Sequence, residues 1–119
     1  LFSPIICDYY SGMVMSVPVY TDMLQKAKTP EEIHKMFSEF YAGEKFVKVM
    51  PLDAQAGEGN MLAGNGCSGW DGLKIFITGN EDRVVLSSQF DNLGKGASGA
   101  AIQCLNIVMG CEEDKGLQL

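Results

Sequence analysis

The sequence predicts an α+β fold, in which an antiparallel or mixed sheet is backed by helices. Two periodicities lead to this prediction, because alternating apolar residues indicate a strand and apolar residues spaced by three or four indicate an amphipathic helix. The expected strands cover residues 12–20, 46–52, 73–78 and 83–90, and the expected helices cover residues 30–42 and 97–109. This order of strands, helix, strands and helix favours a single domain over residues 1–119.

The first strand, residues 12–20, alternates apolar side chains with residues that point to the opposite face of the sheet. Pro18 has no backbone N–H to donate, and proline is therefore confined to the edges and bulges of sheets. We expect this strand near an edge. Its alternating apolar residues are Met13, Met15, Val17 and Val19.

The helix at residues 30–42 has a recognisable start and stop. Thr29 stands at the N-cap, Pro30 takes the first helical position, and Glu32 completes a capping box. Gly43 follows as a terminator. One stripe of the helix is apolar and should face the core. It consists of Ile33, Met36, Phe37, Phe40 and Tyr41.

The second half of the chain contains a long loop and a hairpin. Residues 53–72 are rich in Gly, Ala and Asn, and a loop of this length in a small domain is usually functional or mobile. Turn-forming residues at 79–82 separate two strand patterns. The strands at 73–78 and 83–90 should therefore pair as a hairpin.

The last helix should begin at Lys95 or Ala97, run to Met109 and end at Gly110. Small and apolar residues recur on one of its faces, with Ile102 beside them, so this face should pack on the core. The face consists of Ala97, Ala101, Cys104, Leu105 and Val108.

Composition excludes several kinds of partner and site. The chain has nine basic and fifteen acidic residues among 119, a net charge of −6, so it offers no basic face to nucleic-acid phosphates. No apolar run approaches the ~20 residues that span a membrane. Four cysteines without a C-x-x-C pair and one histidine, His34, predict neither a metal site nor a nucleophile–base pair. Reduced cysteines are typical of the cytoplasm, where we expect the protein.

One glycine motif lies where a phosphate-binding turn would lie. Gly94, Gly96 and Gly99 form G-x-G-x-x-G between a strand and a helix, which is the setting of dinucleotide binding. A complete Rossmann unit needs a second parallel strand about 20 residues on, and only the polar residues 112–119 remain. Two interpretations stay open. Unpaired N–H groups at the helix start, with Lys95, could bind an anion, or the glycines only allow a tight turn and close packing.

Residues 90–103, with the sequence FDNLGKGASGAAIQ, closely resemble the N-acetyl-γ-glutamyl-phosphate reductases. That family has a D-N-L-x-K-G-A-x-G-x-A-x-Q helix start near its C-terminus, followed by N-x-x-x-G and an acidic stretch that ends in G-L. Residues 40–47 resemble its F-Y-x-x-E-x-F-V block, and Gly12 and Asn65 also fit. The resemblance extends over essentially all 119 residues. Further matches are Asn106, Gly110, Glu112, Glu113, Gly116 and Leu117.

The resemblance implies an oxidoreductase that reduces N-acetyl-γ-glutamyl phosphate to the semialdehyde with NADPH in arginine biosynthesis. The family's nucleophilic cysteine and its histidine lie upstream of this segment, and Cys7 and His34 match neither. The chain begins with Leu1, so we expect a fragment that lacks the nucleotide-binding domain and is inactive alone. Its implied partners are the acyl phosphate, the rest of the same polypeptide and further copies of it. Ser11 stands where some members have an arginine.

The resemblance also assigns the cofactor-binding residues, and it assigns no catalytic residue or metal ligand to this chain. The Asn92 amide and the backbone at residues 94, 96 and 97 should lie near the nicotinamide, and Lys95 should favour a nearby phosphate or steer anions. The dipole at the helix start and the Lys95 charge supply a physical reason for the assignment. The cofactor-binding residues are Asn92, Gly94, Lys95, Gly96 and Ala97.

Three alternatives remain open at this stage. Aspartate-semialdehyde dehydrogenases share the glycine-rich helix start, although the 40–47 block and the acidic tail weigh against them. A relative acting on a carrier-protein-bound aminoadipyl phosphate is the second alternative. The third is a non-catalytic module that binds anions or assembles through apolar faces and an exposed sheet edge.

Overall fold

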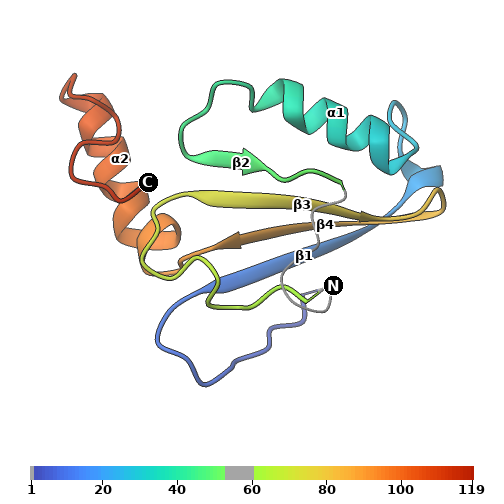
Figure 1. Ribbon diagram of the computed structural model, residues 1–119, viewed down its shortest axis with the longest axis horizontal. Coiled ribbons are helices and arrows are strands. Elements are labelled where there is room, and N and C mark those ends of the chain that lie inside the picture. The colour runs from blue at the N-terminus through green and yellow to red at the C-terminus, as the bar shows by residue number, and fades with distance from the viewer. Residues whose placement is uncertain (1, 53–60) are drawn as a thin grey trace.

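The computed structural model describes residues 2–52 and 61–119, which fold around a four-stranded sheet (Figure 1). The strand order is β1-β4-β3-β2. β4 pairs antiparallel with β1 and β3, whereas β2 runs parallel to β3. The predicted α+β class with a mixed sheet is therefore confirmed. The strands are β1 (Met13–Tyr20), β2 (Val47–Val49), β3 (Leu73–Gly79) and β4 (Arg83–Phe90).

All four predicted strands are present, and one of them is shorter than predicted. β1 lies at the end of the strand order, as Pro18 predicted. β3 and β4 form the predicted hairpin. β2 covers only Val47–Val49. The N–H of Met50 still donates to Ile75 O at 2.9 Å, and the strand ends before this residue. Residues 53–60 of the predicted loop lie outside the described residues, and residues 61–72 contain turns but neither helix nor strand.

The helix α1 (Pro30–Phe40) lies against one face of the sheet (Figure 1). Its start is the predicted one, since Thr29 Oγ1 accepts the Glu32 N–H at 3.2 Å. The Glu32 carboxylate, however, accepts the N–H of Lys28 at 2.8 Å, one residue before the N-cap. Under the helix lies a core cluster of Ala27, Ile33, Ile75, Ile77 and Val84.

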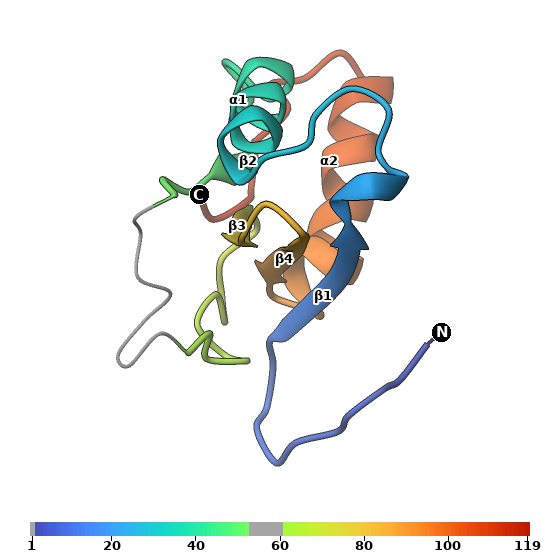
Figure 2. The same ribbon diagram turned by 90° about the vertical axis from the view of Figure 1, so that its right-hand side faces the viewer.

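Two residues of the predicted α1 stripe do not reach this core. Phe37 and Tyr41 pack against the cluster, but Met36 and Phe40 remain 47% and 77% exposed. The stripe is wider than the contact, because the sheet beneath the helix presents few strands and β2 is short. Figure 2 shows the N-terminal residues leading away from the sheet on the side opposite α1.

The helix α2 (Gly99–Val108) corrects the predicted last helix in two ways. It begins two residues later than Ala97, because residues Gly94–Ser98 form a π-helical turn, η3. It also stands at one end of the sheet rather than over a face of it (Figure 1). Its predicted core face is consequently exposed, with Leu105 at 55% and Val108 at 84%. A helical pattern identifies an apolar face, but it does not say which surface covers that face.

The C-terminal residues hold α2 through polar contacts. Asn106 is buried, and its amide Nδ2 donates to the backbone oxygens of Glu113 and Lys115 at 3.0 and 2.9 Å. Gln103 Nε2 donates to the Glu113 carboxylate. Within residues 2–52 and 61–119, no helix is both long enough and apolar enough to cross a membrane.

Candidate functional site

A buried carboxylate organises the turn that joins β4 to η3. Asp91 follows β4 directly and is only 4% exposed. Its Oδ2 accepts the Gly69 N–H at 2.6 Å and the Ser11 hydroxyl at 3.2 Å, and its Oδ1 accepts the Leu93 N–H at 2.8 Å. The Ser11 hydroxyl also contacts that of Ser68. Asp91 thus ties the segment before β1 and the 61–72 loop to the glycine-rich turn.

The surroundings of Asp91 favour its charged form. Burial acts to raise the pKa of the carboxyl, but backbone N–H groups, including that of Gly94, and the Ser11 hydroxyl stabilise the carboxylate more strongly. The net result is a pKa below the ordinary value of an aspartate. Asp91 is therefore an anion built into the chain three residues before η3 begins.

The backbone N–H groups of the turn are largely used inside the chain. Gly96 N donates to Asp91 O at 2.8 Å, and Ser98 N donates to Leu93 O at 3.1 Å. Gly99 N donates to Gly94 O, which completes the π-helical pattern. These donors are therefore engaged inside the chain, whereas the anion-binding interpretation, one of the two left open by the sequence, needs unpaired N–H groups. The π turn explains the difference, since its i to i−5 bonds reach back to the end of β4.

The glycines of the motif are explained by close packing, the second interpretation drawn from the sequence. A Cβ added at Gly94 would lie 2.7 Å from Asp71 Oδ1, and one added at Gly99 would lie 2.2 Å from the same atom. A Cβ at Gly96 would lie 3.0 Å from the Phe90 ring. Gly96 and Ala97 are nevertheless exposed, so one side of the turn remains open to a ligand.

Lys95 is held beside the turn. Its Nζ donates to Gln103 Oε1 and lies 4.7 Å from the centre of the Phe46 ring. A lysine over an aromatic face is attracted by the ring quadrupole. The Lys95 charge therefore remains near the turn, but its ammonium group is already committed to two contacts.

Asn92 has a fixed amide orientation. Its Oδ1 accepts the Gly12 N–H at 2.7 Å, and since a backbone N–H can only donate, the oxygen must face Gly12. Gly12 has φ +123° and packs so closely that an added Cβ would lie 2.3 Å from Gly64 O and 2.5 Å from Asn65 Cα. Gly12, Asn65 and Asn92, which are far apart in sequence, thus lie in one cluster beside the turn.

Comparison with known proteins identifies the family of the chain. Residues 1–92 match the family described as semialdehyde dehydrogenase, dimerisation domain. The chain belongs to this family. It is 38% identical to N-acetyl-gamma-glutamyl-phosphate reductase 2 of Nostoc sp. over 98% of the chain, and 38% identical to the N-acetyl-gamma-glutamyl-phosphate reductases of Brucella ovis and Brucella suis over 92% of it. The resemblance stated from the sequence is confirmed.

The chain spans little more than a third of the length of these relatives. The chain covers 38% of the length of the Nostoc protein and 36% of the length of the two Brucella proteins. The relatives therefore contain long segments that have no counterpart in this chain.

The chain brings all five predicted cofactor residues into one turn, but sequence reasoning missed the residues that shape it. Asp71 and Asp91 are the two carboxylates against the glycines. Asp91 had a recognisable signal, because an aspartate in a turn often accepts the backbone N–H of the residue two positions further on. Asp71 had none, since its partners lie far away in sequence.

The other candidate residues lie away from the turn or are unsuited to nucleophilic chemistry. His34 Nε2 is 3.0 Å from Met50 O, and Cys7 is exposed. Cys67 is buried and its Sγ–H donates to Gln89 Oε1 at 3.4 Å. Burial raises the pKa of the Cys67 thiol; Lys74 opposes this effect and Asp91 adds to it. In residues 2–52 and 61–119, no group of three or more His, Cys, Asp or Glu side chains is placed to hold a metal ion.

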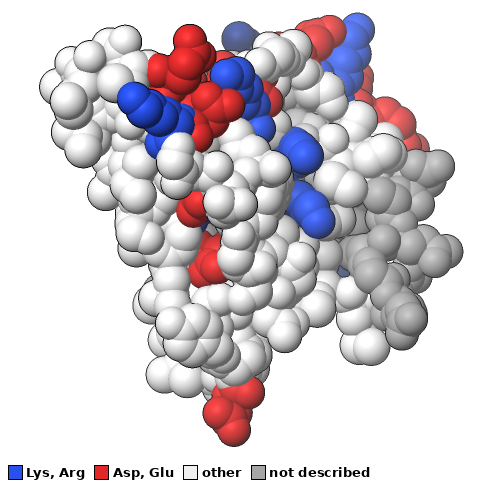
Figure 3. Space-filling model, turned by 60° about the vertical axis from the view of Figure 1, so that its left-hand side comes forward, with Lys and Arg blue, Asp and Glu red and all other residues white. Residues whose placement is uncertain are grey.

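The surface near α2 is unevenly charged. Figure 3 shows charged side chains gathered along one rim of this end of the molecule, while much of the remaining face carries none. One exposed pair at this end is formed by Lys45 and Asp114, whose Nζ and Oδ2 atoms are 3.2 Å apart. The hydrogen bond from Lys45 is the main cause that lowers the pKa of Asp114.

Proposed function

We propose that this chain is the C-terminal part of an oxidoreductase that reduces N-acetyl-γ-glutamyl phosphate to the semialdehyde with NADPH in arginine biosynthesis. One observation carries the proposal. Gly12, Asn65 and Asn92 all fit the reductase pattern, and they come from three separate segments that meet beside the glycine-rich turn. Reductases of this name are 38% identical over almost the whole chain, which supports the same assignment.

The turn suits the nicotinamide end of the cofactor better than its phosphates. The amide of Asn92 is oriented with its oxygen on Gly12, which leaves Nδ2 as the group to donate to a carboxamide oxygen. The exposed backbone at Gly96 and Ala97 allows a flat ring to approach. Asp71 and Asp91 place negative charge against the glycines, which disfavours a phosphate there. Gly94 shapes the turn, and Lys95 is proposed to steer anions from nearby.

The chemistry of the reaction requires residues from elsewhere in the polypeptide. A cysteine thiolate displaces phosphate from the acyl phosphate to give a thioester, and NADPH, when bound, supplies the hydride that reduces it. Cys67 is a poor nucleophile because it is buried with a raised pKa, His34 lies on α1 against Met50 O, and Cys7 does not match the nucleophile of the family. This domain therefore contributes binding and orientation.

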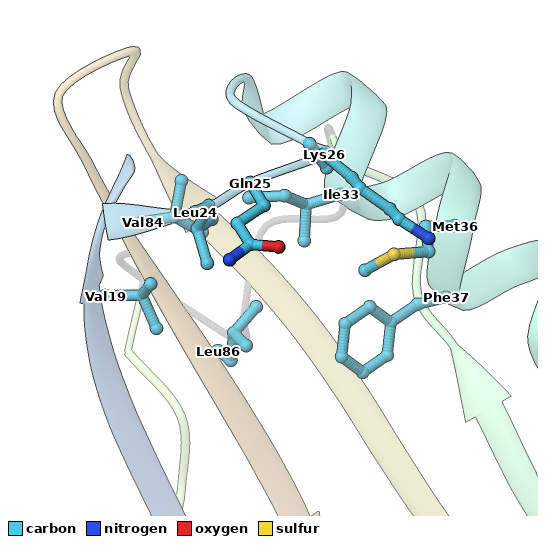
Figure 4. Close-up of a pocket in the computed structure, with 10 residues that line it drawn as sticks. Val19, Leu24, Gln25, Lys26, Ile33, Met36, Phe37, Val84 and Leu86 are labelled. Carbon is cyan, nitrogen blue, oxygen red and sulfur yellow. The ribbon is translucent and has the colours of Figure 1, made fainter. Parts of the chain in front are cut away.

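Exposed apolar surface supports association with other parts of the polypeptide and with a second copy. A pocket of about 270 Å³ opens between α1 and the sheet, and Figure 4 shows apolar side chains from both sides lining it. Met13, Met15 and Val17 of β1 are also exposed. Apolar patches of this kind mark interaction sites, in agreement with a family described as a dimerisation domain. We propose a cytoplasmic homo-oligomer.

The isolated chain should not reduce the acyl phosphate. Purified residues 1–119, incubated with NADPH and N-acetyl-γ-glutamyl phosphate, should show no loss of NADPH absorbance above the blank, because Cys7 and His34 match neither reacting residue of the family and Cys67 is buried with a raised pKa. The full-length protein is the positive control. Turnover by the isolated chain would contradict the proposed division of labour.

In the full-length protein, Gly96→Val should weaken NADPH binding by about tenfold or more, since the added side chain blocks approach to the turn. NADPH fluorescence titration measures the effect, and thermal unfolding shows whether the variant is folded. His34→Ala, which alters a remote helix, is the control and should bind as the wild type does.

A second variant separates blocked approach from disturbed packing. The new side chain at position 96 also meets the Phe90 ring, so Gly96→Val combined with Phe90→Leu relieves the internal crowding. NADPH binding should stay weak in the double variant. If it returns to the wild-type value, the glycines serve packing alone and the assignment of the cofactor residues fails.

A further inference from the structure

Asp71 connects the C-terminal residues to the glycine-rich turn. Its Oδ2 accepts the Gln118 N–H at 2.9 Å, and its own N–H donates to Gln118 O at 2.8 Å. These two bonds form a closed pair between the 61–72 loop and the end of the chain. The Gln118 side chain takes no part in either bond.

The other oxygen of Asp71 is wedged against the turn. Oδ1 occupies the space that a Cβ would need at both Gly94 and Gly99, at 2.7 and 2.2 Å from the ideal Cβ positions. One carboxylate therefore touches the first and the last glycine of the motif. The spacing of the two glycines matches the shape of Asp71, independently of any ligand.

The C-terminal residues are themselves braced, so the contact can transmit position. Asn106 of α2 holds the backbone oxygens of Glu113 and Lys115, and Gln103 holds the Glu113 carboxylate. Gln103 also accepts from Lys95 in the turn. Contacts therefore connect the turn to α2, α2 to the C-terminal residues, and the C-terminal residues through Asp71 back to the turn.

We propose that Asp71 is a positioning residue, which uses the backbone of Gln118 to fix the glycine-rich turn in the geometry that receives the nicotinamide. This inference rests on the proposed function for the role of the turn. Asp71 itself need not touch the cofactor. Loosening its bond to Gln118 should loosen the turn and weaken cofactor binding without changing the reacting groups.

The test uses a backbone substitution in the full-length protein. Gln118→Pro removes the N–H that Asp71 accepts, whereas Gln118→Ala keeps it and changes only the side chain. Losing one hydrogen bond of typical net strength should raise the KM for NADPH roughly three- to tenfold. The KM for the acyl phosphate and kcat should stay near the wild-type values. Gln118→Ala should match the wild type throughout.

Hydrogen exchange of the amides at residues 93–99 gives a readout that needs no activity. These amides should exchange faster in Gln118→Pro, by a similar factor, and should be unchanged in Gln118→Ala. Asp71→Ala, which removes the wedge as well as the acceptor, should have the larger effect on both measurements. Thermal unfolding of each variant identifies a protein that has lost its fold.

The outcomes separate this inference from the proposed function. Equal exchange in Gln118→Pro and Gln118→Ala would overturn the positioning role, whatever reaction the enzyme performs. Faster exchange with an unchanged KM for NADPH would overturn its link to the cofactor. Absence of NADPH-dependent reduction in the wild type would instead refute the proposed function, and exchange would still decide whether Asp71 holds the turn.

Discussion

Asp91→Asn should lower the free energy of unfolding of the chain by roughly 2–4 kcal/mol. The carboxylate is buried and accepts hydrogen bonds from Ser11, Gly69 and Leu93 through both of its oxygens. An amide keeps the size of the side chain but replaces one acceptor by a donor, so at least one N–H group faces another. Urea unfolding followed by fluorescence of Trp70, the single tryptophan, measures the loss.

The matched control is Asp114→Asn. Both aspartates have a lowered pKa, but Asp114 is exposed and its main partner is the exposed Lys45. Exposed ion pairs contribute little to stability, so this variant should unfold almost as the wild type does. Equal losses for the two variants would show that the hydrogen bonds of Asp91 do not stabilise the fold.

The effect of Asp91 should depend on pH in a defined direction. A native pKa below the unfolded value, which is about 3.9 for aspartate, stabilises the protein fully above that value. The stabilisation disappears as the pH falls through the native pKa, because the native carboxylate then takes up a proton. The difference between wild type and Asp91→Asn should therefore be constant near neutral pH and shrink only in acid.

Local signals in the sequence were sufficient for most of the fold. Thr29, Pro30 and Glu32 predicted where α1 begins because a helix start depends on neighbouring residues. The alternation in β1 and its Pro18 predicted an outer strand for the same reason. These elements need no knowledge of distant contacts.

The position of α2 could not be predicted in this way. Its apolar residues gave a correct helix, but the π turn at Gly94–Ser98 changes how the helix leaves the sheet. That turn depends on Asp91 O and Leu93 O accepting N–H groups five residues ahead. Leu105 and Val108 are consequently exposed, and the sequence of this segment contains no sign of it.

The residues of the candidate site also fall into those with a local sequence signal and those without one. Asn92, Gly94 and Gly96 were identified because they lie in one short motif. Asp71 and its contact with Gln118 join positions 47 residues apart, and neither residue belongs to a recognisable pattern. A motif thus gave the residues proposed to face the cofactor, and only the structure gave the residues that hold them.

Gly12→Ala should be at least as damaging as any change in the turn, with an expected loss of about 3 kcal/mol or more in the free energy of unfolding. Gly12 has φ +123°, which an alanine rarely adopts, and the new Cβ would collide with the backbone of Gly64 and Asn65. Backbone atoms cannot rotate away as a side chain can. The collision should also displace the N–H that orients Asn92.

Gly43→Ala separates strain from collision. Gly43 also has a positive φ, +85°, but nothing lies within 4 Å of its added Cβ, so only the backbone conformation is penalised. The expected loss is about 1 kcal/mol. Urea unfolding of both variants measures the stability difference, and NADPH titration of the full-length proteins measures the consequence for Asn92. Gly12 packs against the 61–72 loop and its N–H also orients Asn92, whereas Gly43 has no such contact. Gly12→Ala should therefore weaken NADPH binding, and Gly43→Ala should not. Similar stability losses at the two positions would show that the contact of Gly12 with the 61–72 loop can relax.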